Sequence, residues 1–326
     1  MKHHPVHNLV ARQDGVSLIE LMITLVVALL LLGGLIQVYL SNKQSYNAQE
    51  QLARMQESGR FAMDLITADL RRAGYWGGTV DLGRISGNPG PLGLAAHSHT
   101  CVDSTWARMI RWRVSGLDNA KGAYDCAASY DVATSSDILA VRYAAATPID
   151  VATTTLNGST LYLRDNTESG VIMTGTAASE TANNPPAVDG DAVLALVRPI
   201  VSRAFFIGDS GRSCPNGDAI PALMRVRLDS ATGLLVEEEI ASGVEHFEVR
   251  YLHNNEYKDA SAIIDNDEWL NVSAVRVWLL VRGECIEQGL VNPTTYAMGN
   301  RNVPAEDIRR QLYVSTVMLR NTVVGE

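Results

Sequence analysis

The stretch QDGVSLIELMITLVVALLLLGG, residues 13 to 34, decides the fold of this chain. It belongs to an apolar segment from Val16 to Ile36, which as a helix rising about 1.5 Å per residue spans roughly 31 Å, the thickness of a membrane's hydrocarbon core. Glu20 is the only charged residue in that segment. An ionised carboxylate at the centre of a membrane helix costs roughly 3 kcal/mol, so we expect Glu20 to be kept for a purpose.

Two ordinary interpretations of this segment are a single transmembrane anchor and a cleaved secretory signal. A secretory signal ends in a small-residue cleavage site that follows its apolar run. Here the run ends GGLIQVYLSNKQ, residues 33 to 44, without such a site. The sequence therefore favours an apolar helix that stays attached to the protein.

The junction between the polar leader and the apolar run resembles the type IV prepilin processing motif. The leader MKHHPVHNLVARQDG ends in Gly15, VSLIE follows, and Glu20 is the fifth residue counted from Val16. The resemblance implies that prepilin peptidase cuts after Gly15 and N-methylates Val16, although the family's usual first residue is phenylalanine. It further implies that Glu20 meets the charged terminal amine of a neighbouring subunit, because a buried charge is tolerable when it is paired.

Gly33 and Gly34 lie late in the apolar run. Each glycine weakens a helix by about 1 kcal/mol relative to alanine. In related pilins the anchor helix loosens near its middle on assembly, and the resemblance implies that this pair supplies that flexibility. The alternative is the simple tolerance of glycine in membrane helices.

The chain after the apolar run predicts a continuing helix and then a β-rich head. The helix extends to about Ala73, because apolar residues recur every three to four positions. These residues are Leu52, Met55, Ala62, Ile66 and Leu70. Three stretches, RFAMDLITADLRRAGYWG (60–77), VSAVRVWLLVRG (272–283) and RRQLYVSTVMLRN (309–321), are similar to the PilW family of minor pilins.

Alternating apolar and polar side chains predict strands with one buried face at 110–114, 224–228, 247–251 and 275–281. More uniformly apolar runs at 137–144 and 191–207 indicate central strands, and 81–100 and 174–190 are expected to be loops. The predicted fold is therefore α+β and pilin-like, with a long membrane-spanning N-terminal helix packed on an antiparallel β-sheet head. We expect a leader at 1–15, a transmembrane and fibre-core helix at 16–40, its periplasmic continuation at 41–80 and the head at 81–326.

Composition gives weaker guidance. The net charge is −9 and no block of consecutive basic residues occurs, so no nucleic-acid partner is predicted. The four cysteines form no CxxC pair, which favours disulfides in an oxidising compartment over a zinc site. Four cysteines allow three pairings. The pairing of Cys101 with Cys126, which closes a local loop, and of Cys214 with Cys285 is the one we favour.

Two sets of residues suggest other chemistry. LAAHSHTC with His97 and GDSG with Ser210 resemble chymotrypsin-like protease motifs, but the serine motif continues GRSCP and lacks the residues that shape an oxyanion hole. The acidic runs at 189–191 and 265–268 lack the spacing of a calcium loop, and His3, His4 and His7 lie in the leader. We therefore predict a protein that is not an enzyme and uses no metal or cofactor.

The resemblance implies a minor pilin that takes part in the initiation and assembly of type IV pili, in a tip priming complex. The implied partners are prepilin peptidase, other minor pilins, the major pilin, an inner-membrane assembly platform and a pilus-tip adhesin. The implied location is the inner membrane, with a single pass and a periplasmic head, and then the pilus tip. The nearest alternative is a minor pseudopilin of a type II secretion system, and a membrane-anchored serine protease is the alternative from another class.

Overall fold

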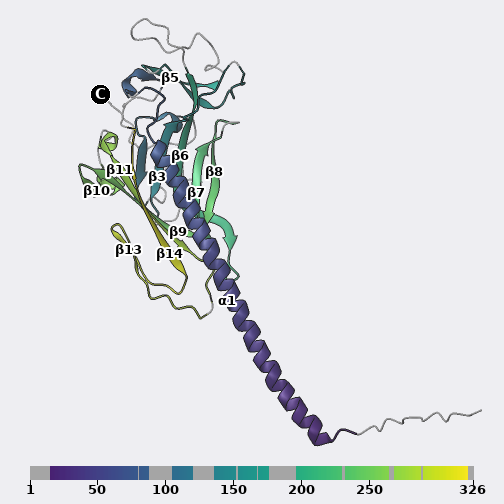
Figure 1. Ribbon diagram of the computed structural model, residues 1–326. Helices are drawn as coiled ribbons and strands as arrows, with labels where there is room; N and C mark the ends of the chain where they lie inside the picture. Colours follow the sequence, from purple (N-terminus) through teal and green to yellow (C-terminus); the bar gives the residue numbers. More distant parts are fainter. Residues whose placement is uncertain are drawn as a thin grey trace, which may run out of the picture. The chain divides into compact units, whose positions relative to one another are not determined.

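The computed structural model describes residues 15–79, 81–87, 105–119, 136–151, 153–166, 168–175, 196–229, 232–263, 268–287 and 289–321. The chain divides into two compact units after Glu50. The first unit contains the N-terminal part of helix α1, Leu18–Arg72, and the second contains the rest of that helix and all of the strands (Figure 1).

The part of α1 in the second unit is amphipathic. Its buried residues recur every three to four positions, which is the spacing of one helix face. They are Met55, Gly59, Ala62, Ile66, Asp69 and Leu70. The predicted stripe therefore holds from Met55 onward, whereas Leu52 is more than a third exposed.

Helix α1 ends in a closed turn. Gly74 adopts a positive φ of 75°, a conformation that glycine takes at little cost. The side-chain amide of Asn321 donates to the carbonyl oxygens of Arg72 at 3.2 Å and Ala73 at 3.0 Å. The last carbonyls of the helix are thus satisfied by a residue from the other end of the head.

The larger sheet of the head has eight strands in the order β1-β5-β4-β6-β3-β2, with β7 paired to β6 and β8 paired to β7. All its pairs are antiparallel except β1 with β5. The strands are β1 Ile85–Ser86, β2 Val114–Leu117, β3 Ile138–Ala144, β4 Leu161–Asp165, β5 Gly170–Thr174, β6 Leu196–Ser213, β7 Ala219–Leu228 and β8 Leu235–Ser242. The 18-residue strand β6 is central, as its apolar sequence predicts.

A second sheet has four strands in the order β10-β9-β11-β14, all antiparallel. They are β9 Val244–His253, β10 Glu256–Lys258, β11 Ala274–Arg282 and β14 Arg310–Met318. Strands β12 Tyr296–Met298 and β13 Arg301–Val303 form a separate hairpin, and neither pairs with a strand of the two sheets. Short 3-10 helices occupy Leu82–Arg84, Trp106–Arg108, Ala260–Ala262 and Glu268–Asn271.

The two sheets share one hydrophobic core. Strand β9 of the second sheet contacts β3, β6 and β7 of the first. Large side chains that are almost fully buried fill the core, among them Trp76, Trp106, Trp112, Phe205 and Phe247. Burying an aromatic side chain of this size contributes roughly 2 to 3 kcal/mol, so these residues are a main source of the head's stability.

Most of the predicted strands are confirmed, and one is wrong. The alternating stretches at 224–228, 247–251 and 275–281 lie in β7, β9 and β11, and β3 is buried along its whole length. Residues 110–113 form a turn, because the N–H groups of Ile110 and Trp112 donate locally to the carbonyls of Arg108 and Met109. Both side chains are buried, so alternation there reports burial in a turn and not a strand.

The predicted loops are partly tested. Residues 82–86, inside the loop expected at 81–100, form a 3-10 helix and the short strand β1 instead. Most of that stretch lies outside the described residues, and so does the loop expected at 174–190 beyond residue 175.

Candidate functional site

The predicted processing site lies just before α1 and is exposed. Gly15, Val16 and Ser17 precede the helix, and the Val16 side chain is 71% exposed. The N–H of Leu21 donates to the carbonyl oxygen of Ser17 at 3.1 Å, which closes the first helical turn. Cleavage after Gly15 remains a prediction, and the exposed backbone is compatible with it.

Glu20 lies in the first turn of α1. A carboxylate there is stabilised by the partial positive charge of the helix N-terminus, and its spacing from Ser17 is that of a capping box. The residue therefore has a local reason to be acceptable in the helix, in addition to its predicted role in assembly. Pairing with a neighbouring subunit's amine stays a prediction.

The first unit exposes a long apolar surface. Helix α1 is long and apolar enough near its start to cross a membrane by length and composition. The exposed apolar side chains include Leu18, Ile19, Leu21, Met22, Ile23, Leu25, Val26, Leu29, Leu30, Leu31, Leu35 and Ile36. An apolar surface of this extent is stable only in lipid or against other apolar helices, so it is the strongest feature for membrane anchoring and fibre packing.

Gly33 and Gly34 are helical in this surface. A Cβ atom at either position would have no described neighbour within 4 Å, so close packing inside the chain does not require glycine there. Their predicted part in loosening the helix remains untested.

In the second unit, a buried ion pair fixes the end of α1 to the larger sheet. Asp69 of α1 accepts from the Arg203 guanidinium of β6 at 2.7 and 2.8 Å and from the Tyr143 hydroxyl of β3 at 2.7 Å. Burial, with the nearby Asp69 charge, raises the pKa of Tyr143 to about 12, so the hydroxyl stays a donor at physiological pH. The sequence pattern did not indicate this network, because Asp69 reads as an ordinary solvated helix charge.

Close packing also joins α1 to the second sheet. A Cβ atom on Gly59 would lie 2.2 Å from the ring of Tyr313 on β14. The Tyr313 ring therefore lies directly on the helix backbone at this glycine. Because glycine alone lacks the Cβ atom, Gly59 has an evident structural reason in this helix.

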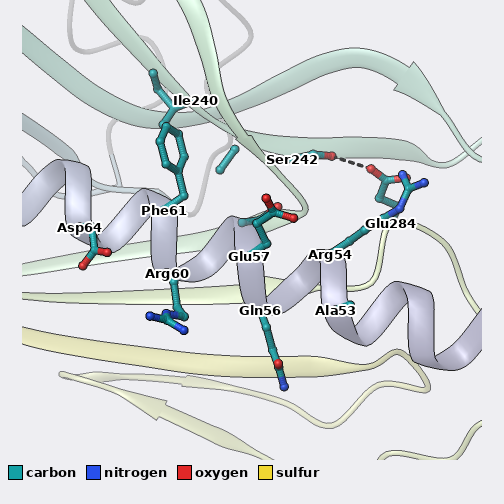
Figure 2. Close-up of a pocket in the computed structure, with 12 residues that line it drawn as sticks. Ala53, Arg54, Gln56, Glu57, Arg60, Phe61, Asp64, Ile240, Ser242 and Glu284 are labelled. Carbon is teal, nitrogen blue, oxygen red and sulfur yellow. Dashed lines mark hydrogen bonds between the residues drawn. The ribbon is translucent and has the colours of Figure 1, made fainter.

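A surface groove of about 880 Å³ lies between α1 and the end of β8. Figure 2 shows Phe61 pointing toward Ile240, with Glu57 and Arg54 following along the helix toward Glu284. The Ser242 hydroxyl donates to the Glu284 carboxylate at 3.0 Å. A half-exposed aromatic ring beside charged residues is typical of a protein contact surface, so this groove is a candidate docking surface of the head.

The disulfide between Cys214 and Cys285 confirms one predicted pair. It joins the end of β6 to the chain that follows β11, with a Cα to Cα distance of 5.7 Å and a sequence separation of 71. Arg212 forms ion pairs with Glu239 and with Glu284 at 3.7 Å beside it. The disulfide thus connects the two sheets next to the groove. Cys101 and Cys126 lie outside the described residues.

The residues considered for other chemistry are only partly visible. Ser210 is half-exposed in β6, and its Oγ accepts from the N–H of Arg212 at 3.3 Å. His97, His3, His4 and His7 lie outside the described residues, as do 189–191 and most of 265–268. Among the described residues, no three His, Cys, Asp or Glu side chains gather as a metal site would require.

Another buried carboxylate, that of Asp137, links the two sheets by hydrogen bonds. Asp137, just before β3, accepts from the N–H groups of Val249 on β9 at 2.8 Å and Asn119 at 3.1 Å. Burial, reinforced by the Glu248 charge, raises the pKa of Asp137 from 3.8 to about 8. The side chain bridges backbone segments of both sheets, so its role is structural.

Comparisons with known proteins find matches to the N-terminal segment and to the C-terminal part of the head. Residues 204–321 match the family model described as type IV pilus-assembly protein W, and residues 10–36 match the prokaryotic N-terminal methylation motif. No curated protein sequence matches the chain significantly. A solved type IV-like pilin from Thermus thermophilus aligns at 11% identity over 60% of this chain and 83% of its own, with a TM-score of 0.28.

The two family matches contain most of the predicted site residues. The methylation motif includes Gly15, Val16, Glu20 and both helix glycines, and the other match runs from β6 to the residue that closes the end of α1. Both matches fall on one chain with a long apolar N-terminal helix and a β-rich head, so the chain carries a prepilin-type methylation motif and a segment similar to the PilW family.

Proposed function

We propose that this protein is a minor pilin that is processed by prepilin peptidase and takes part in the initiation and assembly of type IV pili. The observation that carries the proposal is the joint presence of the methylation motif at 10–36 and the PilW match at 204–321. The motif contains the predicted cleavage site and the apolar anchor, and the second match supports a relation to the PilW family. The predicted sites are cleavage between Gly15 and Val16 and N-methylation of Val16.

The proposed location is the inner membrane, with the head in the periplasm, followed by transfer into the fibre. The exposed apolar part of α1 supports this route, because it can move from lipid into a bundle of similar helices without meeting water. The Cys214–Cys285 disulfide is consistent with an oxidising compartment for the head.

Within a fibre, the proposed role of Glu20 is to pair with the terminal amine of a neighbouring pilin. Processing would create that amine at residue 16, four positions before the carboxylate. A charge in an apolar bundle is stable when an opposite charge meets it, so the pair would fix the register of adjacent subunits. The proposed partners are other minor pilins, the major pilin, the inner-membrane platform and a tip adhesin.

The experiment that tests this function replaces Glu20 with glutamine in cells that make the fibre. We expect the Glu20→Gln protein to be processed and held in the membrane but lost from sheared fibres, because an amide cannot neutralise the amine. Glu50→Gln, at an exposed position of the same helix outside the groove, is the matched control and should assemble normally. Normal assembly of Glu20→Gln would contradict the proposal.

The tip priming role needs a second measurement. Deleting the gene should sharply reduce fibres built from the major pilin, and labelled protein should lie at fibre ends at low abundance. A processed protein that stays in the membrane and is missing from the sheared fraction would instead identify a minor pseudopilin of a type II secretion system.

A further inference from the structure

The two sheets of the head end in edge strands of opposite character. Strand β8 closes the larger sheet with Glu237, Glu238 and Glu239 and with a register shift in its pairing to β7. Charges and bulges of this kind prevent an edge from pairing with another strand. Strand β14 closes the second sheet without either device, since residues 311–318 carry no charge and no proline and pair with β11 without a register shift.

The hydrogen-bond register shows which groups β14 presents at its free edge. The N–H of Leu319 donates to Ser273 and the N–H of Gly283 donates to Arg309, both at 2.9 Å, at the two ends of the β11–β14 ladder. Paired residues alternate between bonded and non-bonded positions, so odd-numbered residues of β14 bond to β11 and even-numbered ones point their N–H and C=O groups away.

One contact supports this register independently. The Tyr296 hydroxyl donates to the outward carbonyl of Arg310 at 3.1 Å, at the start of the strand. Beyond that point, no described residue donates to or accepts from the outward backbone groups of the even-numbered positions. These are Leu312, Val314, Thr316 and Met318.

The side chains beside this edge are apolar on the outer face of the sheet. Val314 is 52% exposed and Met318 is 60% exposed. Trp278 lies opposite Val314 on β11, and Arg276 lies opposite Thr316 and stacks on Tyr257 with its guanidinium 4.2 Å from the ring centroid. An added strand would therefore find an apolar surface for every second side chain.

Among the described residues, carboxylates lie only at the start of this edge, where Arg310 pairs with Glu245 and Glu306, and beyond that point the nearby charges are positive. Strands β11 and β14 contain no acidic residue, and exposed Arg320 follows β14. On the helix side, the exposed Arg60 lies near the Tyr313 hydroxyl. Burial raises the pKa of Tyr313, and the positive charge of Arg60 partly offsets that rise. Figure 2 shows the Arg60 and Phe61 side chains extending in opposite directions from α1, and both residues line the groove.

We propose that the free edge of β14 binds an extended segment of a partner subunit, in which apolar residues alternate with acidic ones, as an added β-strand. The apolar side chains would lie over Val314 and Met318, and the acidic ones would face Arg60. Backbone groups at the even positions would supply the hydrogen bonds, as in other cases of strand addition. That the partner is a pilus subunit rests on the proposed function, whereas the edge itself does not.

The test uses the full chain in detergent micelles and a fluorescent heptapeptide of alternating valine and glutamate. We expect binding by fluorescence anisotropy that weakens with salt, and no comparable binding of the valine–lysine peptide. Hydrogen exchange resolved to single residues should show new protection at Val314, Thr316 and Met318, with Ser315 and Val317 unchanged because their N–H groups already bond to β11.

Two matched variants separate backbone pairing from side-chain contact. Thr316→Pro removes an outward N–H without touching the β11 ladder and should weaken the valine–glutamate peptide about tenfold, whereas Thr316→Ala keeps that N–H and should bind nearly normally. If Thr316→Pro fails to fold, Arg60→Glu gives the second test, since it should reverse the preference between the two peptides.

Equal binding of both peptides, or protection outside the even positions, would overturn the proposal. Protection that grows with protein concentration in the absence of peptide would also overturn it, since it would identify a second copy as the occupant. None of these results depends on Glu20 or on fibre formation, so they can fail while the proposed function stands.

Discussion

Glu20 and Asp137 are carboxylates in contrasting surroundings. Glu20 lies exposed at the start of a helix, where the helix N-terminus favours its charge. Asp137 is buried at the junction of two sheets and holds two backbone N–H groups. The first is proposed to act between subunits, whereas the second stabilises the fold of one head.

The raised pKa of Asp137 predicts that the head loses stability as pH rises. The folded state keeps the proton up to a pKa of about 8, whereas the unfolded chain releases it near the ordinary 3.8. The stabilisation is therefore complete below pH 4 and is lost as the pH rises toward 8, because the native state binds more protons in that window.

Asp137→Asn should flatten this dependence. Denaturant unfolding from pH 5 to pH 8 should show a slope that differs from the wild-type slope by up to about 1.4 kcal/mol per pH unit. The comparison of slopes is needed because burial also raises the pKa values of Glu237 and Glu245 and adds a dependence of the same sign. Identical slopes in the two proteins would contradict the assignment.

At the scale of elements, the end of α1 is attached to both sheets by different means. Asp69 holds Arg203 and Tyr143 of the larger sheet, and Gly59 admits Tyr313 of the second sheet. The helix thus bridges strands that are far apart in sequence. A disturbance at α1 is expected to reach the whole head.

Asp69→Ala tests the polar attachment. It leaves Arg203 without its carboxylate and Tyr143 without its acceptor, so we expect the free energy of unfolding to fall by about 2 kcal/mol. Asp64→Ala, at an exposed position of the same helix, is the control and should change stability by no more than about 0.5 kcal/mol. Equal effects of the two substitutions would show that the ion pair contributes nothing.

Sequence periodicity predicted the elements better than their connections. The 3.6-residue pattern located the buried face of α1, and alternation located β7, β9 and β11, because both patterns follow directly from which side chains face a core. The same pattern misplaced a strand at 110–114, since Ile110 and Trp112 are buried by a turn. Burial is encoded locally, but the backbone path that achieves it depends on distant residues.

At the scale of the whole molecule, the Cys214–Cys285 disulfide connects the two sheets. Its pairing was one of three that the sequence allowed, and it depends on folding that brings residues 71 apart into contact. The sequence favoured this pair, whereas the polar network at Asp69 and the exposed edge of β14 were not predictable, because each requires the three-dimensional neighbours of residues that look ordinary in the sequence.

Replacing both Cys214 and Cys285 with serine should lower the free energy of unfolding by about 2 to 4 kcal/mol, since a long closed loop restricts the unfolded chain. Denaturant unfolding of the purified full chain measures this loss. The control is Asp209→Ser, in the same strand as the residues before Cys214. It should change stability little, because Asp209 is exposed. Unchanged stability of the double variant would mean that the disulfide does not form in the cell.

We propose above all that this chain is cut after Gly15 and built into a pilus. The most direct test is mass spectrometry of the N-terminal peptide from sheared surface fibres and from membranes. We expect a peptide that begins with N-methylated Val16 and occurs in the fibre fraction at low abundance. A chain that keeps residues 1–15 in both fractions would contradict processing and assembly together.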